Sequence, residues 1–273
     1  MKRRPKILLV NDDGAEAPGL WALFGQIATI ADPVVVAPAR EQSARGHAIT
    51  VRRDMALEEL RHRGRKVGYQ LGGTPADCVK LALAHLYRGR ISMVISGINW
   101  GANVGHNILY SGTVGAALEG AMYGLPAIAV SLRDDLEPPP HFDAAARVAR
   151  RLAEDILQHG LPAGVILNVN VPNLPLRDMA GTAITRQGQE SYIDLFVIRR
   201  SADGSRHCAN LGGQRLPSRS SEHALDDLEL NKRLISITPL HFDLTSHVTV
   251  GTLHDRIAHL CLLPGRGKQG GPS

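Results

Sequence analysis

The feature that most constrains this fold is a regular alternation between short apolar runs and segments with helical periodicity. Lys6–Val10 and Ile91–Ser96 are short and apolar, which is typical of parallel strands covered on both faces. Phe142–His159 repeats apolar residues at helical spacing, and its arginines and acids fall on the opposite face. Strands that alternate with helices predict a mostly parallel sheet with right-handed crossovers.

The same alternation predicts the remaining elements. Further strands are expected at Pro33–Ala37, Val67–Leu71, Ala127–Leu132 and Gly164–Val169, with an extended stretch near His47–Arg52. Further helices are expected from about Pro18, over Ala76–Leu86 and over Val114–Tyr123. Beyond about Asn173 we expect β-like runs at Gly181–Arg186, Ile193–Arg200 and Leu234–Thr238, a polar arm or loop over Ser201–Asp227 and a helix over Val248–Leu260. These elements predict one α/β domain over residues 1–263 (a core of about 1–175, the arm and the closing helix) and a flexible tail over residues 264–273.

Composition excludes several classes of protein. The 273 residues are 44% hydrophobic, enough for a real core, yet no apolar run approaches the roughly 18 residues of a spanning helix. The first apolar run stops after Val10, so no signal peptide is predicted. Lys and Arg number 31 against 26 Asp and Glu, a net charge of +5 that is dispersed and therefore predicts a basic surface rather than a specific nucleic-acid site. Cys78, Cys208 and Cys261 lie far apart, which indicates reduced thiols in a cytoplasmic protein.

Two adjacent carboxylates, Asp12 and Asp13, follow directly after the first predicted strand. In open α/β sheets, ligands bind beyond the carboxyl ends of the strands. Adjacent carboxylates repel each other and cannot both be buried without a counter-charge. A divalent cation is the simplest counter-charge, because hard cations take oxygen ligands. The alternative is a pair of acids that cap the following helix.

A stretch rich in glycine and asparagine, Ser96–Gly105, follows the predicted strand Ile91–Ser96. Its glycines recur at four-residue spacing and allow close approach of the backbone, while Asn99 and Asn103 offer neutral amide oxygens. The spacing differs from the dinucleotide-binding pattern GxGxxG. A plain surface loop is the alternative, although long loops in compact domains usually have a functional reason.

Small and hydroxyl-bearing residues open the helix predicted near Val114. Ser111, Gly112 and Thr113 stand at its start, where free N–H groups and the helix dipole favour an anion. No lysine follows the glycine, so this is not a Walker A loop, and an ordinary N-cap is the alternative. Ser43, in the loop after the second predicted strand, reads on its own as an ordinary loop hydroxyl.

Together, these three groups at one edge of a sheet suggest a phosphate ester bound to a metal. Serine-hydrolase chemistry has no support, because the pattern GxSxG is absent. Two adjacent aspartates can share one metal, and this favours water over an aspartyl-phosphate as the reacting species. The proton donor to the leaving alcohol stays open: His106 is nearby in the sequence, but a histidine in a loop is more often simply exposed.

Several segments carry a resemblance to a known family. The chain contains ILLVNDDGAEAPGL, APAREQSARGHAIT, LGGTPADCVKLAL and the long run ISGINWGANVGHNILYSGTVGAALEGAMYGLPAIAVS, followed later by NVNVP, TRQG and ISITPLHFDLT. Over nearly its whole length it resembles the survival protein E (SurE) family of metal-dependent 5′/3′-nucleotidases. The resemblance implies a Rossmann-like, three-layer α/β fold with a mostly parallel sheet. It also implies a β-rich C-terminal arm used in homodimer or homotetramer assembly.

The resemblance also implies residue roles and an activity. It implies metal ligands at Asp12, Asp13, Ser43 and Asn99, catalytic roles for Asp12, Asp13 and Asn99, and phosphate contacts at Asn103, Ser111, Gly112 and Thr113. One divalent cation per subunit, Mg²⁺ or Mn²⁺, is the implied cofactor. The implied reaction is hydrolysis of nucleoside 5′- and 3′-monophosphates by metal-activated water, with short polyphosphate as a substrate of some members. The alternative is a non-catalytic nucleotide-binding regulatory module, which has no need for two carboxylates at a strand end.

The chain departs from the family pattern in the arm. His207–Asn210 stands where aromatic residues are common in the family, and Arg233 and Leu234 stand where Gly-Tyr is common. Base selection needs stacking surfaces and paired polar groups, each worth about 1–3 kcal/mol. We therefore expect weak discrimination among bases and a firm requirement for the terminal phosphate. The alternative is that aromatic rings from elsewhere, such as Tyr110 or Tyr192, or from a partner subunit, fill the gap.

Overall fold

A computed structural model describes residues 4–134, 139–201, 203–219 and 223–258. The chain divides into two compact units, residues 1–242 and residues 243–273. The prediction of one domain extending to residue 263 therefore stays a prediction. The predicted tail over residues 264–273, like Cys261, lies outside the described residues. None of the described helices is long and apolar enough to cross a membrane.

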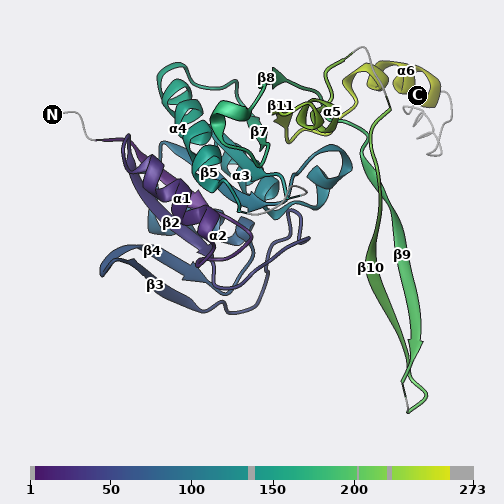
Figure 1. The fold of residues 1–273 in the computed structure, drawn as a ribbon, viewed down its shortest axis with the longest axis horizontal. Coiled ribbons are helices and arrows are strands. Elements are labelled where there is room, and N and C mark those ends of the chain that lie inside the picture. The colour runs from purple at the N-terminus through teal and green to yellow at the C-terminus, as the bar shows by residue number, and fades with distance from the viewer. Residues whose placement is uncertain (1–3, 135–138, 202, 220–222, 259–273) are drawn as a thin grey trace, which may run out of the picture. The chain divides into compact units, whose positions relative to one another are not determined.

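Nine of the described strands form one sheet with the order β3-β4-β2-β1-β5-β6-β7-β11-β8 (Figure 1). Every neighbouring pair is parallel except β3–β4 and β7–β11, so the expected mostly parallel α/β sheet is confirmed. The strands are β1 (Lys6–Val10), β2 (Asp32–Pro38), β3 (Leu57–His62), β4 (Arg65–Leu71), β5 (Met93–Trp100), β6 (Ala127–Leu132), β7 (Val165–Val171), β8 (Gly181–Ile184) and β11 (Leu234–His241).

Helices cover both faces of this sheet and make three layers. α1 packs against α4 on one face, and α2 packs against α3 on the other (Figure 1). Their bounds are α1 (Pro18–Ile27), α2 (Pro75–Leu81), α3 (Gly112–Met122) and α4 (Phe142–His159). Shorter helical turns are η1 (Ala82–Leu86), η2 (Gly105–Tyr110) and η3 (Leu176–Asp178), and α5 (Asp226–Asn231) precedes β11.

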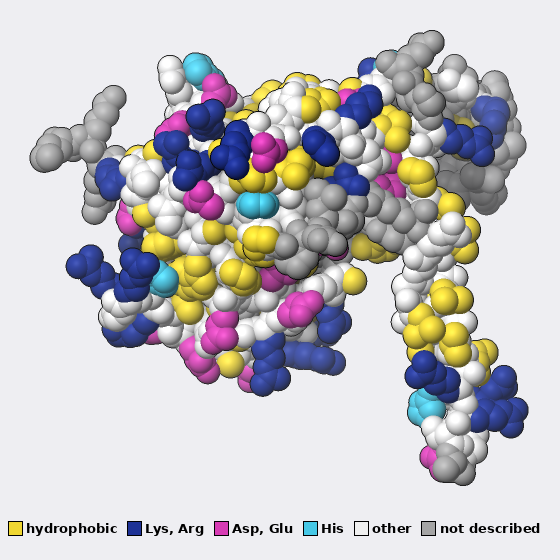
Figure 2. All heavy atoms as spheres, in the orientation of Figure 1, with side chains coloured by type: hydrophobic (Ala, Val, Ile, Leu, Met, Phe, Trp, Pro, Cys, Tyr) yellow, Lys and Arg dark blue, Asp and Glu magenta, His cyan; other side chains and the backbone are white. Residues whose placement is uncertain are grey.

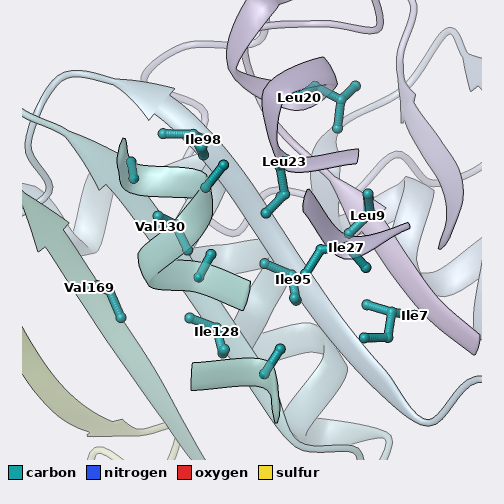
Figure 3. Close-up of a cluster of buried hydrophobic side chains, with 14 of the residues drawn as sticks. Ile7, Leu9, Leu20, Leu23, Ile27, Ile95, Ile98, Ile128, Val130 and Val169 are labelled. Carbon is teal, nitrogen blue, oxygen red and sulfur yellow. The ribbon is translucent and has the colours of Figure 1, made fainter. Parts of the chain in front are cut away.

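The alternation of side chains along β1 shows why its sequence is apolar throughout. Ile7 and Leu9 join the core under α1 and α4, whereas Leu8 and Val10 join the core under α2 and α3. All four are fully buried. Figure 3 shows the first of these cores, where side chains of the central strands meet those of α1. Because both faces of the sheet are covered, the carboxyl edge of its strands is where polar side chains can gather.

Some details of the predicted elements differ from the structure. The strand expected to end at Ser96 continues as β5 to Trp100, with an irregularity in its pairing to β6 between Ser96 and Asn99. The predicted helix Ala76–Leu86 is α2 followed by the wider turn η1. The edge strand β3 was not predicted, because its sequence LEELRH is mostly polar and largely exposed.

A two-stranded antiparallel hairpin follows β8. It consists of β9 (Ser191–Arg200) and β10 (Arg206–Leu216), and it forms a sheet of its own. The segment Ser201–Asp227, predicted as a polar arm or loop, therefore contains a strand. Figure 2 shows hydrophobic side chains along this hairpin and basic ones towards its tip. In the second unit, α6 (His247–Ala258) confirms the helix predicted near residue 248 as far as the structure describes it.

Candidate functional site

The predicted polar residues meet at the carboxyl edge of the central strands. A hollow of about 330 Å³ lies there, between the ends of β1 and β5, the loop after β2 and the start of α3. Five of the predicted site residues line it: Asp12, Ser43, Asn99, Asn103 and Ser111. Asp13, Gly112 and Thr113 stand beside these residues in the chain but do not line the hollow. Residues that are far apart in the sequence are thus brought to one place.

The side chain of Asp12 is held against the start of α3. It is buried, and its carboxylate accepts hydrogen bonds from the Thr113 hydroxyl at 2.5 Å and from the Thr113 backbone N–H at 3.1 Å. Burial raises the pKa of Asp12 above its ordinary value, although the hydrogen bonds from Thr113 oppose the rise. The carboxylate is therefore fixed in direction but lacks a full counter-charge among the described residues.

Asp13 is less buried and faces β5. Its Oδ2 accepts the Trp100 backbone N–H at 3.3 Å. Burial and then repulsion from Asp12 raise the pKa of Asp13 to about 7. Two neighbouring carboxyls whose pKa values both rise form a site that favours a bound cation, because a cation reverses the cost of ionising them.

The two neutral metal ligands that the family resemblance implies occupy different elements. Asn99 lies near the end of β5, where its side-chain amide donates to the Gly101 carbonyl at 2.6 Å and leaves Oδ1 available. Ser43 lies in the exposed loop after β2, and its hydroxyl donates to Glu41 at 2.5 Å. That loop is tied to the aspartate pair, since Gln42 N–H donates to the Asp12 carbonyl at 2.7 Å.

A buried network behind Asn103 is the part of the site that the sequence did not reveal. The Asn103 backbone N–H donates to Asn170 Oδ1 at 2.8 Å, and its carbonyl accepts from Asn168 at 2.8 Å and from Asn170 at 3.0 Å. Its side-chain amide donates to Ser131 Oγ at 2.8 Å. Asn168 and Asn170 are fully buried on β7, so they position Asn103 rather than contact a ligand. The signal was present as two asparagines at alternate positions of an apolar strand.

The start of α3 has the features of an anion site. Ser111 is its N-cap and accepts the Val114 N–H at 3.1 Å. A Cβ at residue 112 would come within 2.9 Å of the Asp12 side chain, so glycine is required there for the helix to approach the carboxylate. The N–H groups of Thr113 and Val114 are already taken by Asp12 and by the Ser111 hydroxyl, so the helix dipole is what favours a phosphate beside the aspartates.

The donor set fits a hard divalent cation. Asp12 and Asp13 supply carboxylate oxygens, and Ser43 and Asn99 supply neutral ones. The buried Oδ1 of Asn11 has no hydrogen-bond partner within the described part of the chain. No group of three or more His, Cys, Asp or Glu residues that could hold a metal occurs among the described residues. A cation here would rely on two carboxylates, neutral oxygens and water, which is typical of Mg²⁺.

A larger hollow, of about 890 Å³, lies at the opposite edge of the sheet and is lined by Arg4, Lys6 and Arg90 among others. Its positive charges have structural partners. Arg4 donates to the Ala28 carbonyl at the end of α1, and Arg90 donates to the Leu86 carbonyl at the end of η1. Helix C-termini repel anions, so this edge does not compete as a phosphate site.

Comparison with known proteins decides the family. A family model described as "Survival protein SurE" matches residues 7–194. The chain belongs to this family. A protein named 5′-nucleotidase SurE from Syntrophobacter fumaroxidans is 43% identical over 248 residues, covering 91% of this chain and 98% of that protein. A protein of the same name from Syntrophomonas wolfei is 42% identical over 242 residues, covering 89% of this chain and 90% of that protein.

A solved structure of a family member has the same fold. The crystal structure of the SurE protein from Aquifex aeolicus superimposes with a TM-score of 0.79 at 33% sequence identity, covering 92% of this chain and 99% of that chain. The Rossmann-like SurE fold expected from the sequence is therefore confirmed.

Proposed function

We propose that this SurE-family chain is a metal-dependent phosphomonoesterase that hydrolyses nucleoside 5′- and 3′-monophosphates to nucleoside and phosphate. The observation that carries the proposal is the meeting of the adjacent carboxylates Asp12 and Asp13 with the N-terminus of α3, at a hollow also lined by Ser43 and Asn99. Relatives named 5′-nucleotidase SurE, 38–43% identical over most of the chain, support the same reaction. A regulatory module that only binds nucleotides has no comparable support.

The four oxygen-bearing side chains Asp12, Asp13, Ser43 and Asn99 would hold one Mg²⁺ or Mn²⁺. When bound, such a cation would lower the pKa of water and offset the charge that develops on the phosphoryl group. Thr113 holds the orientation of the Asp12 carboxylate, and the position of Asn99 is set by the end of β5. These side chains therefore need little reorganisation when the substrate arrives.

The phosphate would lie at the start of α3, within reach of the side chains of Asn103 and Ser111 and beside the backbone of Gly112 and Thr113; the Thr113 N–H would be shared with Asp12. These donors can hold the non-bridging oxygens and strengthen as negative charge accumulates on them. Their positions are set by α3 and by the asparagines behind Asn103. The requirement for a terminal phosphate follows, because the strongest contacts are directed at it.

A second hollow next to the site gives room for the nucleoside. It has a volume of about 570 Å³ and is lined by His106, Tyr110, Asp194 and Asn210 among others. Tyr110 is 65% exposed and lines this hollow as well as the one with Asp12. Stacking on a tyrosine ring tolerates any base, which supports the expectation of weak base discrimination. Short polyphosphate remains a further proposed substrate.

Assembly and compartment belong to the same proposal. The hairpin β9–β10 exposes Ile193, Leu195, Phe196 and Ile198, each more than half exposed. An isolated two-stranded hairpin of this kind is marginally stable, and this supports a homodimer or homotetramer in which it is covered. Cys78 and Cys208 are free thiols, which supports a reducing, cytoplasmic compartment.

The experiment is phosphate release by the metal-stripped protein. We expect no release from 5′-AMP or 3′-AMP until Mg²⁺ or Mn²⁺ is added, and none from cyclic or diester nucleotides at any metal concentration. Nucleotide binding without phosphate release under every metal condition would instead establish the regulatory module.

A further inference from the structure

Glu119 is a buried carboxylate that the proposed reaction does not use. It lies on α3, its side chain is 6% exposed, and two side chains, those of His47 and Lys80, donate hydrogen bonds to it. Oε2 accepts from His47 Nε2 at 2.8 Å, and Oε1 accepts from Lys80 Nζ at 3.1 Å. Burial opposes ionisation, but the hydrogen bonds from His47 and Lys80 outweigh it and the pKa of Glu119 is lowered. Since an ionised carboxylate only accepts, His47 Nε2 carries the proton.

His47 belongs to the same loop as Ser43. The loop is attached at one side through Gln42 N–H, which donates to the Asp12 carbonyl, and at the other through Gly46 N–H, which donates to the Tyr110 carbonyl at 2.9 Å. Between these two points, Ala44 has a φ of +57°, a conformation that side chains other than glycine rarely adopt. Such a conformation persists only where the surroundings hold it.

The attachment of this loop to α3 is close. A Cβ at residue 115 would come within 3.0 Å of the Gly46 carbonyl and of the His47 Cα, so glycine at 115 lets the loop lie directly on the helix. The hydrogen bond from His47 to Glu119 then fastens the loop to the same helix whose first turn holds Asp12. One helix therefore positions both a carboxylate ligand and the loop that carries the hydroxyl ligand.

We infer that Glu119 is a positioning residue, which fixes the Ser43 loop through His47 and thereby sets the affinity of the site for its divalent cation. The inference rests on the proposed function, because it assumes a cation held by Asp12 and Ser43. Lys80 shares the carboxylate but belongs to α2 and has no link to the loop among the interactions of the described residues. A change at Lys80 therefore removes the charge pair with Glu119 but leaves the hydrogen bond from His47, so it serves as the control.

The test is calorimetric titration of Mn²⁺ into metal-stripped protein, with the melting temperature of the metal-free form recorded for each variant. We expect His47→Ala and Glu119→Ala each to weaken Mn²⁺ binding by about tenfold. The double variant should be no weaker than either single one, because both changes release the same loop. Glu119→Gln keeps an acceptor for His47 and should restore binding to within about twofold, as should the control Lys80→Gln.

Three results would overturn the inference: unchanged Mn²⁺ affinity in His47→Ala, additive losses in the double variant, or an equal loss in Lys80→Gln. If Glu119→Ala fails to fold, the test relies on His47→Ala, because that change leaves the buried carboxylate of Glu119 in place. Asp12→Asn is measured alongside. If Asp12→Asn binds Mn²⁺ as the unaltered protein does, the proposed metal site itself is wrong; if it binds none while His47→Ala is unaffected, only the role of Glu119 fails.

Discussion

The carboxyl edge of the sheet and the hairpin β9–β10 are built in opposite ways. At the edge, Asp12, Asn103 and Thr113 are buried and each has hydrogen bonds that fix its direction. Along the hairpin, Leu195 and Phe196 are neighbours in the strand, point to opposite faces and are both more than half exposed. The side chains of the site are thus oriented by contacts within one chain, whereas the hairpin has apolar surface on both faces that the described residues leave exposed.

Asp226 links the carboxyl edge of the sheet to the segment before the hairpin. Among the changes proposed below, we expect the largest effect on the unfolding free energy from this residue. Its carboxylate accepts N–H groups from Gly105 at 3.1 Å, next to the site, and from Gly188 at 2.9 Å, shortly before the hairpin. Burial raises the pKa of Asp226 to about 6. Its contribution to stability is therefore fully present below about pH 4 and is lost as the pH rises through 6.

We predict that the unaltered protein loses about 3 kcal/mol of unfolding free energy relative to Asp226→Asn between about pH 3 and pH 8. Urea unfolding of both proteins at several pH values measures this difference. Other titrating groups cancel in the comparison. A difference that does not change with pH would show that Asp226 ionises in the folded protein as easily as in water.

Asn99 and Asn107, which lie close together in the sequence, test the site at the carboxyl edge of the sheet. Asn99→Ala should lower metal-dependent phosphate release about 10- to 100-fold, because it removes a proposed oxygen ligand. Asn107→Ala should lower it less, since Asn107 lines the same hollow from η2 but is not among the implied metal ligands. Steady-state rates across a Mn²⁺ titration give both numbers. Equal effects would mean that the end of β5 does not supply the ligand.

Much of the fold could be predicted because the sheet is buried on both faces. β1, β6 and α4 begin and end at the predicted residues, since an apolar run or a helical stripe gives a clear signal. β3 escaped prediction because it lies at the edge of the sheet and is mostly polar and exposed. The stretch His47–Arg52 forms no strand; hydrogen bonds such as Thr50 N–H to Asp77 at 2.9 Å hold it as a loop.

The candidate site could be predicted only in part. Asp12 and Asp13 stood out because two carboxylates directly follow a strand. The ligand role of Ser43 could be predicted only from the family resemblance, because nothing in the neighbouring sequence distinguishes it from another loop hydroxyl. The hydrogen bonds from Asn168 and Asn170 to Asn103 join residues that are far apart in the sequence, and such contacts require the fold.

Base discrimination tests whether the hairpin contributes to recognition. We predict that kcat/KM for four nucleoside 5′-monophosphates and their 3′-isomers varies by less than about 100-fold among bases, equivalent to about 2.7 kcal/mol. The reason is that Tyr110 offers a ring that any base can stack on, whereas His207–Asn210 offers no aromatic carbocycle. A wider spread would reveal a base pocket and would bring the hairpin into the site.

The smallest effect on the stability of the single chain should come from the hairpin. Changing Phe196 and Ile198 to threonine keeps β-forming residues at exposed positions, so the unfolding free energy of the chain should change by less than about 0.5 kcal/mol. The proposed oligomer should dissociate at concentrations where the unaltered protein remains assembled. Light scattering over a dilution series measures this, and an unchanged oligomer would exclude these side chains from the interface.

The central claim is that the aspartate pair at the end of β1 holds the cation that makes this protein a phosphatase. Its most direct test is phosphate release from 5′-AMP by Asp12→Asn, titrated with Mn²⁺ and compared with the unaltered protein. We predict loss of activity at every Mn²⁺ concentration in a protein that melts at the same or a higher temperature, because one charge of a repelling pair is removed. Phosphate release at the unaltered rate by folded Asp12→Asn would contradict the account.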